Sequence, residues 1–337
     1  MRSQTGVAIA PRRLGHLNLF VTNVEDSARF YSEVCGFREV FREPAISMIF
    51  MSNGNTHHDL GLMEITTGER IGKGGHVQVE PGNGRTAGLN HLGFEMQTEE
   101  QLVQAYRRAK NKAIKINRTT DHQIAHSLYL SELNGHTLEF YADVVEDWQS
   151  VYANSTGELI SGHWDPEAAE PLKKQQGHAD AELFHSDTAV LPARNVAYAA
   201  LPVKDLDASV DYYIDVLGMT LKFTDKEEAR FAVMSGTANS GCDVCLVETT
   251  SFPAARLFFG GIQMHHGQPI KQGFEWLARH QIPATIVGGE NDGALVVIDP
   301  DGIPLVYSTR PALDLMAEFG PAIVAETRKL TSKTSLK

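Results

Sequence analysis

One strand-helix-strand pattern occurs four times along the chain, and this repetition restricts the folds open to it. The segments "LGHLNLFVTNVEDSARFYSEVCGF" (14–37) and "NVAYAALPVKDLDASVDYYIDVLGM" (195–219) superpose at an offset of 182 residues. Each contains an alternating apolar strand, a turn with an Asp or Ser suited to cap a helix, and a helix closed by a glycine. "LNHLGFEMQTEEQLVQAYRRAKNKA" (89–113) repeats the pattern with Thr98 as the expected cap, and a weaker fourth copy begins near 256–264.

Three short alternating strands follow each of these starts, and the last two strands of a copy are joined by turn signals such as Asn134–Gly135 and Asp301–Gly302. The repeating unit is therefore βαβββ. One such unit cannot bury both faces of its small sheet, so we expect paired copies to curl their sheets around a shared cleft. The sequence predicts an α+β fold of four βαβββ units in two domains.

The repeats also set the expected domain boundaries. Units one and two form a first domain over residues 12–146, and units three and four form a second domain over 192–312. The polar stretch 147–191 is expected to be a linker or cover, and 313–337 a short helix with a frayed tail. Residues 67–86 ("TGERIGKGGHVQVEPGNGRT") form a Gly-rich insertion, which we expect to be a mobile loop at the cleft.

Composition excludes several classes of function. Of 337 residues, 42% are hydrophobic and 21% charged, as in globular proteins. The net charge of −12 would repel a phosphate backbone, so we expect no nucleic-acid partner. No apolar run is long enough to span a membrane and the N-terminus does not read as a signal peptide, so the expected location is cytoplasmic. Cys35, Cys242 and Cys245 are too few for a disulfide framework, and one Cys-x-x-Cys lacks the second pair of a structural zinc site.

Equivalent positions on the first and last strands of the four units hold different residues. The two positions are separated by 45, 48, 47 and 47 residues in the successive units. They are occupied by His16 and Gly61, His91 and Glu139, Tyr198 and Cys245, and Phe259 (or Gly260) and Val306. The first domain thus collects two histidines and one glutamate, whereas the second has no set of residues that suits a hard metal ion.

Two neutral imidazoles and one carboxylate on one face of a metal ion form a set that leaves several coordination positions open, and this arrangement suits Fe(II) and oxygen. His16, His91 and Glu139 are the predicted metal ligands. The glycine at position 61 matters because a carboxylate there would add a fourth protein ligand, as fits an isomerase that polarises a carbonyl. With Gly61, a bidentate substrate and O2 can bind together. A buried Glu139 without such partners would be costly.

At these residues the sequence resembles the vicinal oxygen chelate superfamily, and within it the type I extradiol ring-cleavage dioxygenases, which are catechol 2,3-dioxygenase-like. The segments "LGHLNLFV", "LNHLGFEM" and "GHTLEFYAD" resemble the three ligand strands of that family, and "HHDLGL" resembles its acid-base histidine segment. "DHQIAHSLYL" is similar to the strand that carries a further histidine and a tyrosine. The repeat resemblance covers nearly the whole chain, whereas the dioxygenase motifs lie only in the first domain, an order seen in one branch of the family.

The resemblance implies Fe(II), less often Mn(II), an aromatic diol and O2 as substrates, a muconic semialdehyde-type product and commonly a homo-oligomer. It assigns the acid-base role to His58 and the steadying of substrate and oxygen adducts to His122 and Tyr129. Tyr129 lies ten residues before Glu139, which is the family's spacing. Strict strand alternation would favour His57 over His58, because residues 57, 59 and 61 share one face of a regular strand. A strand that begins at residue 59 would remove the conflict.

Two other functions are compatible with the sequence. A glyoxalase-like metal-dependent isomerase uses the same paired units but needs a fourth protein ligand, which Asp59 or Glu64 would have to supply in place of Gly61. A metal-free small-molecule-binding protein of the same fold would carry apolar or aromatic residues in the ligand positions, as the second domain does. The sequence does not identify the diol.

Overall fold

The computed structural model of the chain describes residues 7–154, 162–176, 183–251, 256–267, 270–290 and 292–334. Its α-helices are α1 (Val24–Glu33), α2 (Glu99–Asn111), α3 (Trp148–Asn154), α4 (Leu206–Asp215), α5 (Ile270–Arg279) and α6 (Ala312–Thr334). The strands up to the middle of the chain are β1 (Arg13–Val21), β2 (Arg38–Glu43), β3 (Met48–Ser52), β4 (Leu60–Glu64), β5 (Arg70–Ile71), β6 (Val77–Val79), β7 (Gly88–Glu95), β8 (Ile116–Asp121), β9 (Ala125–Ser131) and β10 (Thr137–Asp143). The later strands are β11 (Ala193–Val203), β12 (Thr220–Asp225), β13 (Phe231–Ser235), β14 (Val244–Glu248), β15 (Phe259–Met264), β16 (Ala284–Val287), β17 (Ala294–Ile298) and β18 (Pro304–Ser308).

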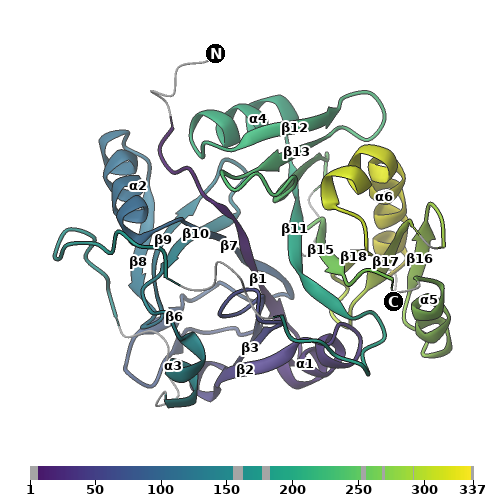
Figure 1. Ribbon diagram of the computed structural model, residues 1–337, viewed down its shortest axis with the longest axis horizontal. Coiled ribbons are helices and arrows are strands. Elements are labelled where there is room, and N and C mark those ends of the chain that lie inside the picture. Colours follow the sequence, from purple (N-terminus) through teal and green to yellow (C-terminus); the bar gives the residue numbers. More distant parts are fainter. Residues whose placement is uncertain are drawn as a thin grey trace.

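Two sheets of eight strands carry the same topology. The first has the order β2-β3-β4-β1-β7-β10-β9-β8, and the second has β12-β13-β14-β11-β15-β18-β17-β16. In each sheet the two units meet through an antiparallel pair, β1 with β7 and β11 with β15. The first and last strands of a unit lie parallel, as β1 does with β4. The predicted α+β fold of four βαβββ units in two paired sheets is confirmed, and Figure 1 shows the central strands β1 and β11 side by side.

Local side-chain caps explain where the helices begin. The Asn23 Oδ1 accepts hydrogen bonds from the backbone of Glu25 and Asp26, so the cap of α1 is an Asn rather than the expected Asp or Ser. Asp205 caps α4 in the equivalent position. Thr98 Oγ1 accepts a hydrogen bond from the backbone of Gln101 at the start of α2, as the sequence predicts.

Alternation along β1 separates an apolar face from a cleft face. Leu17 and Leu19 are fully buried in a core cluster that contains residues of both sheets and of helices α1, α2, α4 and α5. His16 and Asn18 each come one residue before these leucines and therefore face the other side. The two domains share this core, because a Cβ added at Gly260 in β15 would lie 3.0 Å from a methyl carbon of Leu17.

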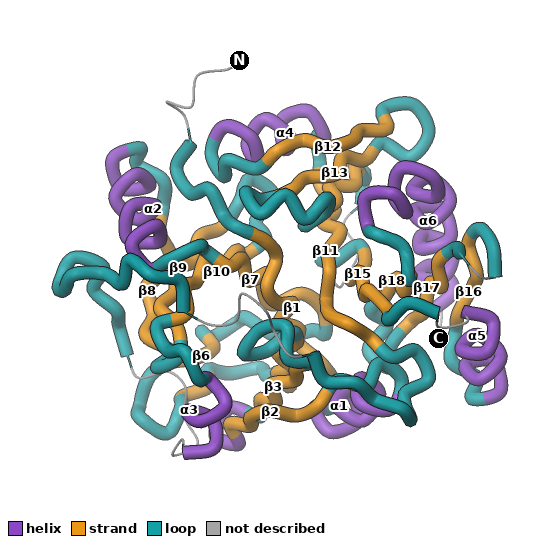
Figure 2. Tube along the Cα trace, viewed as in Figure 1, coloured by secondary structure: helices purple, strands orange, loops and turns teal. Residues whose placement is uncertain are grey.

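Each domain also docks a hairpin turn onto the first helix of the other domain. Asp301, in the turn between β17 and β18, accepts a hydrogen bond of 2.7 Å from the Ser27 hydroxyl of α1. In the equivalent contact, the Asn134 side chain from the turn between β9 and β10 donates a hydrogen bond of 3.2 Å to the Ser209 hydroxyl of α4. These reciprocal contacts join the domains at two places, and Figure 2 draws the two helices concerned, α1 and α4, at the bottom and the top of the view.

Two sequence expectations need correction. Residues 67–86 are not simply a loop, because β5 and β6 pair as a small antiparallel sheet within them. The C-terminal helix is not short: α6 has 23 residues and continues to Thr334, and only 335–337 of the predicted tail lie outside the described residues. The stretch 147–191 begins with helix α3, and its residues 155–161 and 177–182 are not described. The domain boundaries themselves stay a prediction.

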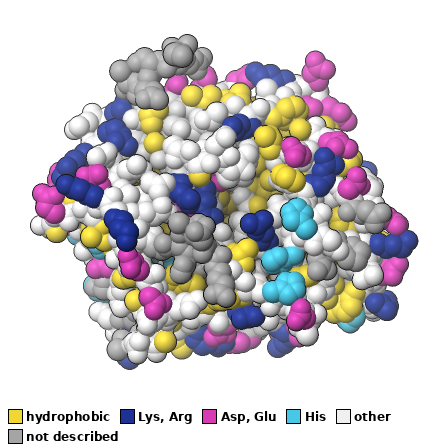
Figure 3. Space-filling view, in the orientation of Figure 1, with side chains coloured by type: hydrophobic (Ala, Val, Ile, Leu, Met, Phe, Trp, Pro, Cys, Tyr) yellow, Lys and Arg dark blue, Asp and Glu magenta, His cyan; other side chains and the backbone are white. Residues whose placement is uncertain are grey.

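The surface drawn in Figure 3 carries charges of both signs, and the three cysteines are buried. On the face drawn in Figure 3, Lys and Arg side chains are interspersed with Asp and Glu rather than gathered in one basic patch. Among the described helices, none is both long and apolar enough to cross a lipid bilayer. Cys35, Cys242 and Cys245 are buried free thiols.

Candidate metal centre

Three strands carry the predicted ligands, and two of the ligands lie in one row across the first sheet. His16 of β1 pairs with Gly93 of β7, and Gly93 pairs in turn with Glu139 of β10. A Cβ atom at Gly93 would lie 2.0 Å from the Nε2 atom of His16, so only glycine leaves room for the imidazole to lie over β7. Sequence analysis did not single out Gly93, although its position between two ligand strands could have indicated a close approach. His91 lies two residues before Gly93 and shares its face.

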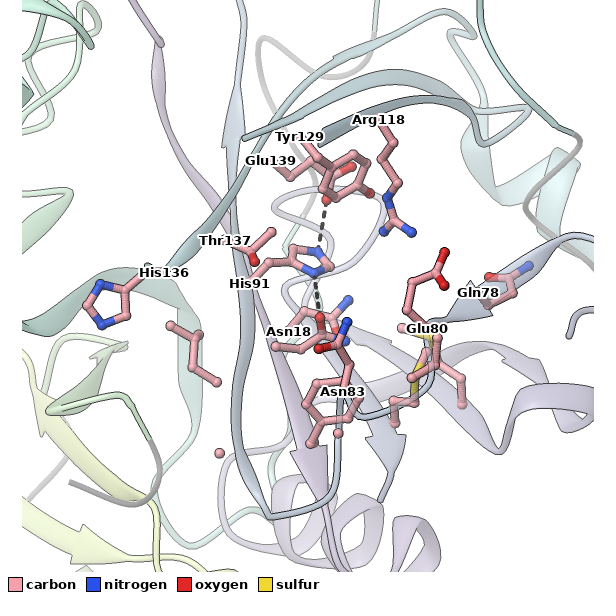
Figure 4. Close-up of a pocket in the computed structure, with 18 of the residues that line it drawn as sticks. Asn18, Gln78, Glu80, Asn83, His91, Arg118, Tyr129, His136, Thr137 and Glu139 are labelled. Atoms are coloured by element: carbon pink, nitrogen blue, oxygen red, sulfur yellow. Dashed lines mark hydrogen bonds and ion pairs between the residues drawn. The ribbon is translucent and has the colours of Figure 1, made fainter. Parts of the chain in front are cut away.

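The three side chains converge on one point. The Nε2 atoms of His16 and His91 are 3.3 Å apart, and each lies close to Oε2 of Glu139, at 3.0 and 2.9 Å respectively. All three side chains are buried. Ligand atoms about 2.1 Å from a metal ion and at right angles to one another are separated by about 3.0 Å, so the donor set fits one octahedral face of a divalent ion. Figure 4 shows the contact between His91 and Glu139.

Protonation states in the metal-free protein suit the same purpose. Burial lowers the pKa of His16 to about 4, so its imidazole is neutral at pH 7 and has a lone pair to donate. Burial alone would raise the pKa of Glu139, but hydrogen bonds with His16 and His91 hold it well below its usual value. The carboxylate is therefore ionised at neutral pH. Two neutral imidazoles and one carboxylate would leave a divalent ion with a net charge of about +1.

Gly61 has Asn18 as its neighbour on the cleft face. Asn18 pairs with Gly61 on one side and with His91 on the other, so the three residues form a second row beside the ligand row. A Cβ atom at Gly61 would lie 2.6–2.7 Å from the side-chain amide atoms of Asn18. The position where a fourth protein ligand would stand therefore borders the Asn18 amide.

A cavity of about 550 Å³ opens over His91 and Glu139, which is within the usual size range for small-molecule sites. Part of its wall comes from the insertion, including Asn83, and Figure 4 draws Gln78 and Glu80 across the pocket from His91. The insertion thus lines the cavity. The sequence predicted that it lies at the cleft but did not identify its contacts. The second domain contributes Arg256, whose guanidinium also donates to the backbone carbonyls of Asn134 and Gly135.

His57 and His58 both line this cavity, but they differ in their partners. The His57 Nδ1 atom lies 2.9 Å from a carboxylate oxygen of Asp143, so that ring is held in place. His58 is 7% exposed, and neither of its ring nitrogens has a hydrogen-bond partner among the described residues. Its ring centre is 4.2 Å from that of His16. Burial, with His16 and His57 adding to it, lowers the pKa of His58 well below its usual value.

Strand periodicity does not decide between these two histidines, because β4 begins only at Leu60. Ligand atoms of His16, His57 and His58 also lie close enough to form a second possible metal set. That set lacks a carboxylate, and one nitrogen of His57 is already engaged by Asp143. The set of His16, His91 and Glu139 therefore fits a hard divalent ion better.

His122 and Tyr129 lie together at the edge of the ligand row. Tyr129 of β9 pairs with Glu139, and its hydroxyl oxygen is 3.0 Å from Nε2 of His122. Burial raises the pKa of Tyr129 well above its usual value and lowers that of His122 to about 4, so at pH 7 the phenol keeps its proton and the imidazole is neutral. Arg118, which sequence analysis did not single out, stacks its guanidinium 4.2 Å from the centre of the Tyr129 ring.

The second cleft is filled with apolar groups instead. Strand register places Tyr198, Cys245, Phe259 and Val306 where the first cleft has His16, Gly61, His91 and Glu139, which also decides between Phe259 and Gly260. These four residues belong to a buried cluster that includes residues of helix α6. Among the described residues, both groups that could hold a metal ion lie in the first domain.

Comparison with known proteins agrees with this architecture. The profile of the Glyoxalase/Bleomycin resistance protein/Dioxygenase superfamily matches residues 13–140 and 195–305, which is more than half of the chain. The chain belongs to this superfamily. Within it, catechol-2,3-dioxygenase of Bacillus subtilis (strain 168) is 28% identical over 106 residues, which make up 32% of this chain and 34% of that enzyme. Biphenyl-2,3-diol 1,2-dioxygenase 3 of Rhodococcus globerulus is 27% identical over 131 residues, covering 39% of this chain and 63% of that enzyme.

The matches to these two relatives cover less than two thirds of their lengths. Solved structures match over more of the chain. A variant of homoprotocatechuate 2,3-dioxygenase from Brevibacterium fuscum superposes with a TM-score of 0.61 at 18% identity, covering 90% of this chain and 73% of that one. The 2,3-dioxygenase LapB from Pseudomonas sp. KL28 superposes with a TM-score of 0.61 at 14% identity, covering 89% and 93%. At such identities the structures establish the shared superfamily fold.

Proposed function

We propose that this protein is an Fe(II)-dependent extradiol dioxygenase that cleaves a catechol-type aromatic diol with O2 and yields a muconic semialdehyde-type product. The observation that carries the proposal is the buried convergence of His16, His91 and Glu139 beside a cavity, with Gly61 rather than a fourth ligand at the equivalent position of β4. The two relatives, a catechol-2,3-dioxygenase and a biphenyl-2,3-diol 1,2-dioxygenase, support the same reaction class. Mn(II) is the alternative metal that the donor set would accept.

His16, His91 and Glu139 would hold the metal ion. When bound, Fe(II) would offer open coordination positions to the diol and to O2, and it would carry electrons between them. The protein's own contribution is the charge balance. Because two neutral histidines and one carboxylate leave a net charge of about +1, a diol that binds as a monoanion neutralises the site. The apolar walls formed by Phe20, Phe50 and Met63 would exclude water from the aromatic ring.

His58 would move the proton. Its pKa is lowered and its nitrogens have no partner among the described residues, so it is a neutral base with a free lone pair beside the diol site. It would accept the proton that a diol hydroxyl loses on binding. The same imidazolium would then return a proton to the oxygen atom that departs when the O–O bond breaks, a general-acid role suited to histidine.

His122 and Tyr129 would orient the reacting groups by hydrogen bonding. Tyr129 keeps its hydroxyl proton because its pKa is raised, so it can donate to an ionised oxygen of the diol. Arg118 packs its guanidinium on one face of the Tyr129 ring. The pair would therefore fix the substrate while His58 exchanges the proton.

The rival functions fit the described residues less well. A glyoxalase-like isomerase needs a fourth protein ligand, but Asp59 accepts hydrogen bonds from Ser52 and from the backbone of Asn53 and is thus engaged away from the cleft. Glu64 accepts a hydrogen bond from the backbone of Val24 at the start of α1. A metal-free binding protein would leave three ionisable groups buried against one another, which is costly without a cation.

The test is an anaerobic reconstitution. Purified protein is loaded with Fe(II), mixed with a panel of monocyclic and bicyclic catechols, and then exposed to air while O2 uptake and the yellow colour of a ring-fission product are followed. We expect one O2 consumed for each diol cleaved. Glu139→Gln and His16→Ala should lose both the iron and the activity.

His280→Ala is the matched control, because His280 is an exposed histidine of the second domain that packs on Trp276. This variant should keep iron and turnover. Iron binding without O2 uptake by any diol would contradict the proposed reaction, and a wild-type protein that binds no metal would favour the binding-protein function. Gel filtration of the loaded protein tests the expected homo-oligomer.

A further inference from the structure

The helix that follows the last strand of each domain packs on the cleft of that domain. In the second domain this helix is α6, whose apolar side chains belong to the buried cluster that fills the cleft. In the first domain it is α3, which has only seven residues. Two of its side chains, Trp148 and Tyr152, are buried in the cluster that contains Phe20 and Phe50 of the cavity wall. The shorter helix thus contributes to the wall of the first cavity instead of filling it.

Tyr152 brings a polar atom to a largely apolar part of that wall. Its ring stacks on the ring of Phe41 in β2 with a distance of 5.0 Å between the ring centres, and the Trp148 ring meets it edge-on at 5.5 Å. The apolar residues of the same cluster that line the cavity include Phe20, Met48, Phe50, Met63, Val79 and Ile124. Packing from these neighbours holds the Tyr152 ring in place.

The hydroxyl group of Tyr152 has no hydrogen-bond partner among the described residues. The residue is 7% exposed, and it lines the cavity. Buried tyrosine hydroxyls usually have a partner, because the hydrogen bond lost to water has to be replaced. A molecule bound in the cavity can supply the missing partner.

The surroundings of this hydroxyl specify the kind of group that would bind there. Burial raises the pKa of Tyr152 well above its usual value, and the carboxylate of Asp143 raises it further. The phenol therefore keeps its proton at neutral pH and can donate it to an acceptor. The carboxylate of Asp143 would repel an anionic group, and the apolar wall disfavours any charged group. A neutral acceptor meets both conditions.

The size of the cavity allows a diol to carry a substituent. Its volume of about 550 Å³ is in the range of sites that hold drug-sized ligands, whereas catechol is a single ring. The predicted metal ligands His91 and Glu139 line the same cavity as Tyr152. A diol held at the metal centre would therefore leave space for a substituent along the apolar wall toward α3.

We propose that Tyr152 is a specificity-determining residue whose hydroxyl donates a hydrogen bond to a neutral oxygen or nitrogen atom on an apolar substituent of the diol. The ligand class is a catechol-type diol that carries an aromatic or alkyl group with such an acceptor. This assignment rests on the proposed function for the diol itself. It places part of substrate recognition on a helix outside the βαβββ units.

The first experiment compares isosteric ligands under argon. A phenyl-substituted catechol and its pyridyl analogues have the same shape, but each pyridyl ring replaces one C–H group with a neutral nitrogen acceptor. Isothermal titration of the Fe(II)-loaded protein at pH 8, where pyridine is neutral, gives the Kd of each ligand. We expect one pyridyl isomer to bind more tightly than the phenyl compound. Tyr152→Phe should weaken that isomer about tenfold, the effect of one lost hydrogen bond, and leave the phenyl compound unchanged.

Tyr106→Phe is the matched control, because Tyr106 is a half-buried tyrosine of α2 away from the cavity wall. This variant should change none of the Kd values. A Tyr152→Phe protein that keeps the preference for the pyridyl isomer overturns the assignment. A wild-type protein that binds the phenyl compound more tightly than every pyridyl isomer also overturns it, as does one that binds catechol but none of the substituted diols.

These outcomes are separate from the proposed reaction. If no diol is cleaved but Tyr152→Phe selectively weakens a pyridyl isomer, the reaction is wrong and the assignment holds. If diols are cleaved while the variant keeps the wild-type preference, the reaction stands and the assignment is overturned.

The metal-free protein offers a second test, which needs no diol. A buried hydroxyl without a protein partner costs stability, so Tyr152→Phe should leave Tm unchanged or raise it. A fall in Tm of about 2–4 °C would show that the hydroxyl already forms a hydrogen bond within the protein. The assignment would then be wrong.

Discussion

The two clefts of this molecule have the same frame and opposite contents. In both, the first strand of the domain carries a ring that lies over a glycine of the neighbouring strand: His16 over Gly93 in one, and Tyr198 over Gly261 in the other. The glycine is thus required by the packing of any ring at this position and says nothing about a metal. What distinguishes the clefts is the chemistry of the side chains that reach the centre.

The second difference between the two clefts is helix α6. Its residues Leu315, Met316, Ile323 and Val324 belong to the same buried cluster as Tyr198 and Val306, so the second cleft is filled by the chain itself. Gly320 allows the close approach, because a Cβ there would lie 2.3 Å from the Phe231 ring. The first cleft stays open and is bordered by the insertion. A shared fold therefore supports an open polar site and a packed apolar core.

The largest expected effect comes from removing the carboxylate that only the first cleft has. Glu139→Ala should weaken Fe(II) binding by more than about 100-fold, because even groups that merely support a ligand contribute 10–100-fold. Val306→Ala, the equivalent change in the second cleft, should leave iron binding unchanged and lower the stability alone. Isothermal titration with Fe(II) under argon measures both. Equal losses of affinity would mean that the two clefts are not chemically distinct.

The second prediction concerns the acid-base group. His58→Phe should lower kcat by about 10²–10⁴-fold with the iron still bound, since proton transfer by a positioned group contributes that much. His57→Phe should have the smaller effect, because His57 is engaged by Asp143. Single-turnover kinetics on iron-loaded variants provide the comparison. A reversal, with His57→Phe the more severe, would reassign the role to His57.

A graft of the ligands into the second cleft tests whether the ligand residues alone or their surroundings decide if a metal ion binds. The triple variant Tyr198→His, Phe259→His and Val306→Glu should bind no iron at the new site, because residues of α6 pack with these positions in one buried apolar cluster. It should be destabilised by about 3–9 kcal/mol, as expected for three buried polar groups without partners. Urea unfolding with and without Fe(II) reports both quantities. A second bound iron would show that the residues alone suffice.

The smallest effect concerns the two hairpin turns that dock the domains. Burial raises the pKa of Asp299, near the β17–β18 turn, from its ordinary 3.8 to about 7. The folded protein therefore holds a proton that the unfolded chain releases, so this contribution to stability is lost as pH rises from about 4 to about 7. Asp299→Asn should raise the unfolding free energy at pH 8 by about 1–3 kcal/mol and have little effect below pH 4.

Glu132, the counterpart in the other turn, should behave in the opposite way. Burial would raise its pKa, but its hydrogen bonds with the His136 side chain and with the backbone N–H groups of Asn134 and His136 together outweigh burial and lower the pKa. As pH falls, the unfolded chain binds a proton at this glutamate before the folded protein does. The stability that Glu132 contributes is therefore present above the ordinary glutamate pKa and is lost as pH falls below it. Unfolding curves of Asp299→Asn and Glu132→Gln between pH 3 and pH 8 make the comparison. Parallel pH profiles of the two variants would contradict it.

Much of the architecture was predictable because it depends on local patterns. Alternation and an offset of 182 residues identify the repeated unit, and the spacing of His16 from Gly61 and of His91 from Glu139 identifies equivalent strand positions. The side-chain period of a strand is two, so a repeat that keeps its length also keeps the same residues on the same face. The structure brings the three predicted ligands together for that reason, while their role as ligands stays a prediction.

What the sequence by itself determined was thus the fold, the pairing of the units and the residues that reach each cleft. Only the tertiary structure decided the neighbours across strands: that Gly93 makes room for His16, that Asn18 borders Gly61, and that His58 has no partner among the described residues while His57 has one. It also decided that α6 fills the second cleft and that the insertion lines the first. These contacts join residues far apart in the chain, and no local period encodes which distant side chain occupies the space beside a given one.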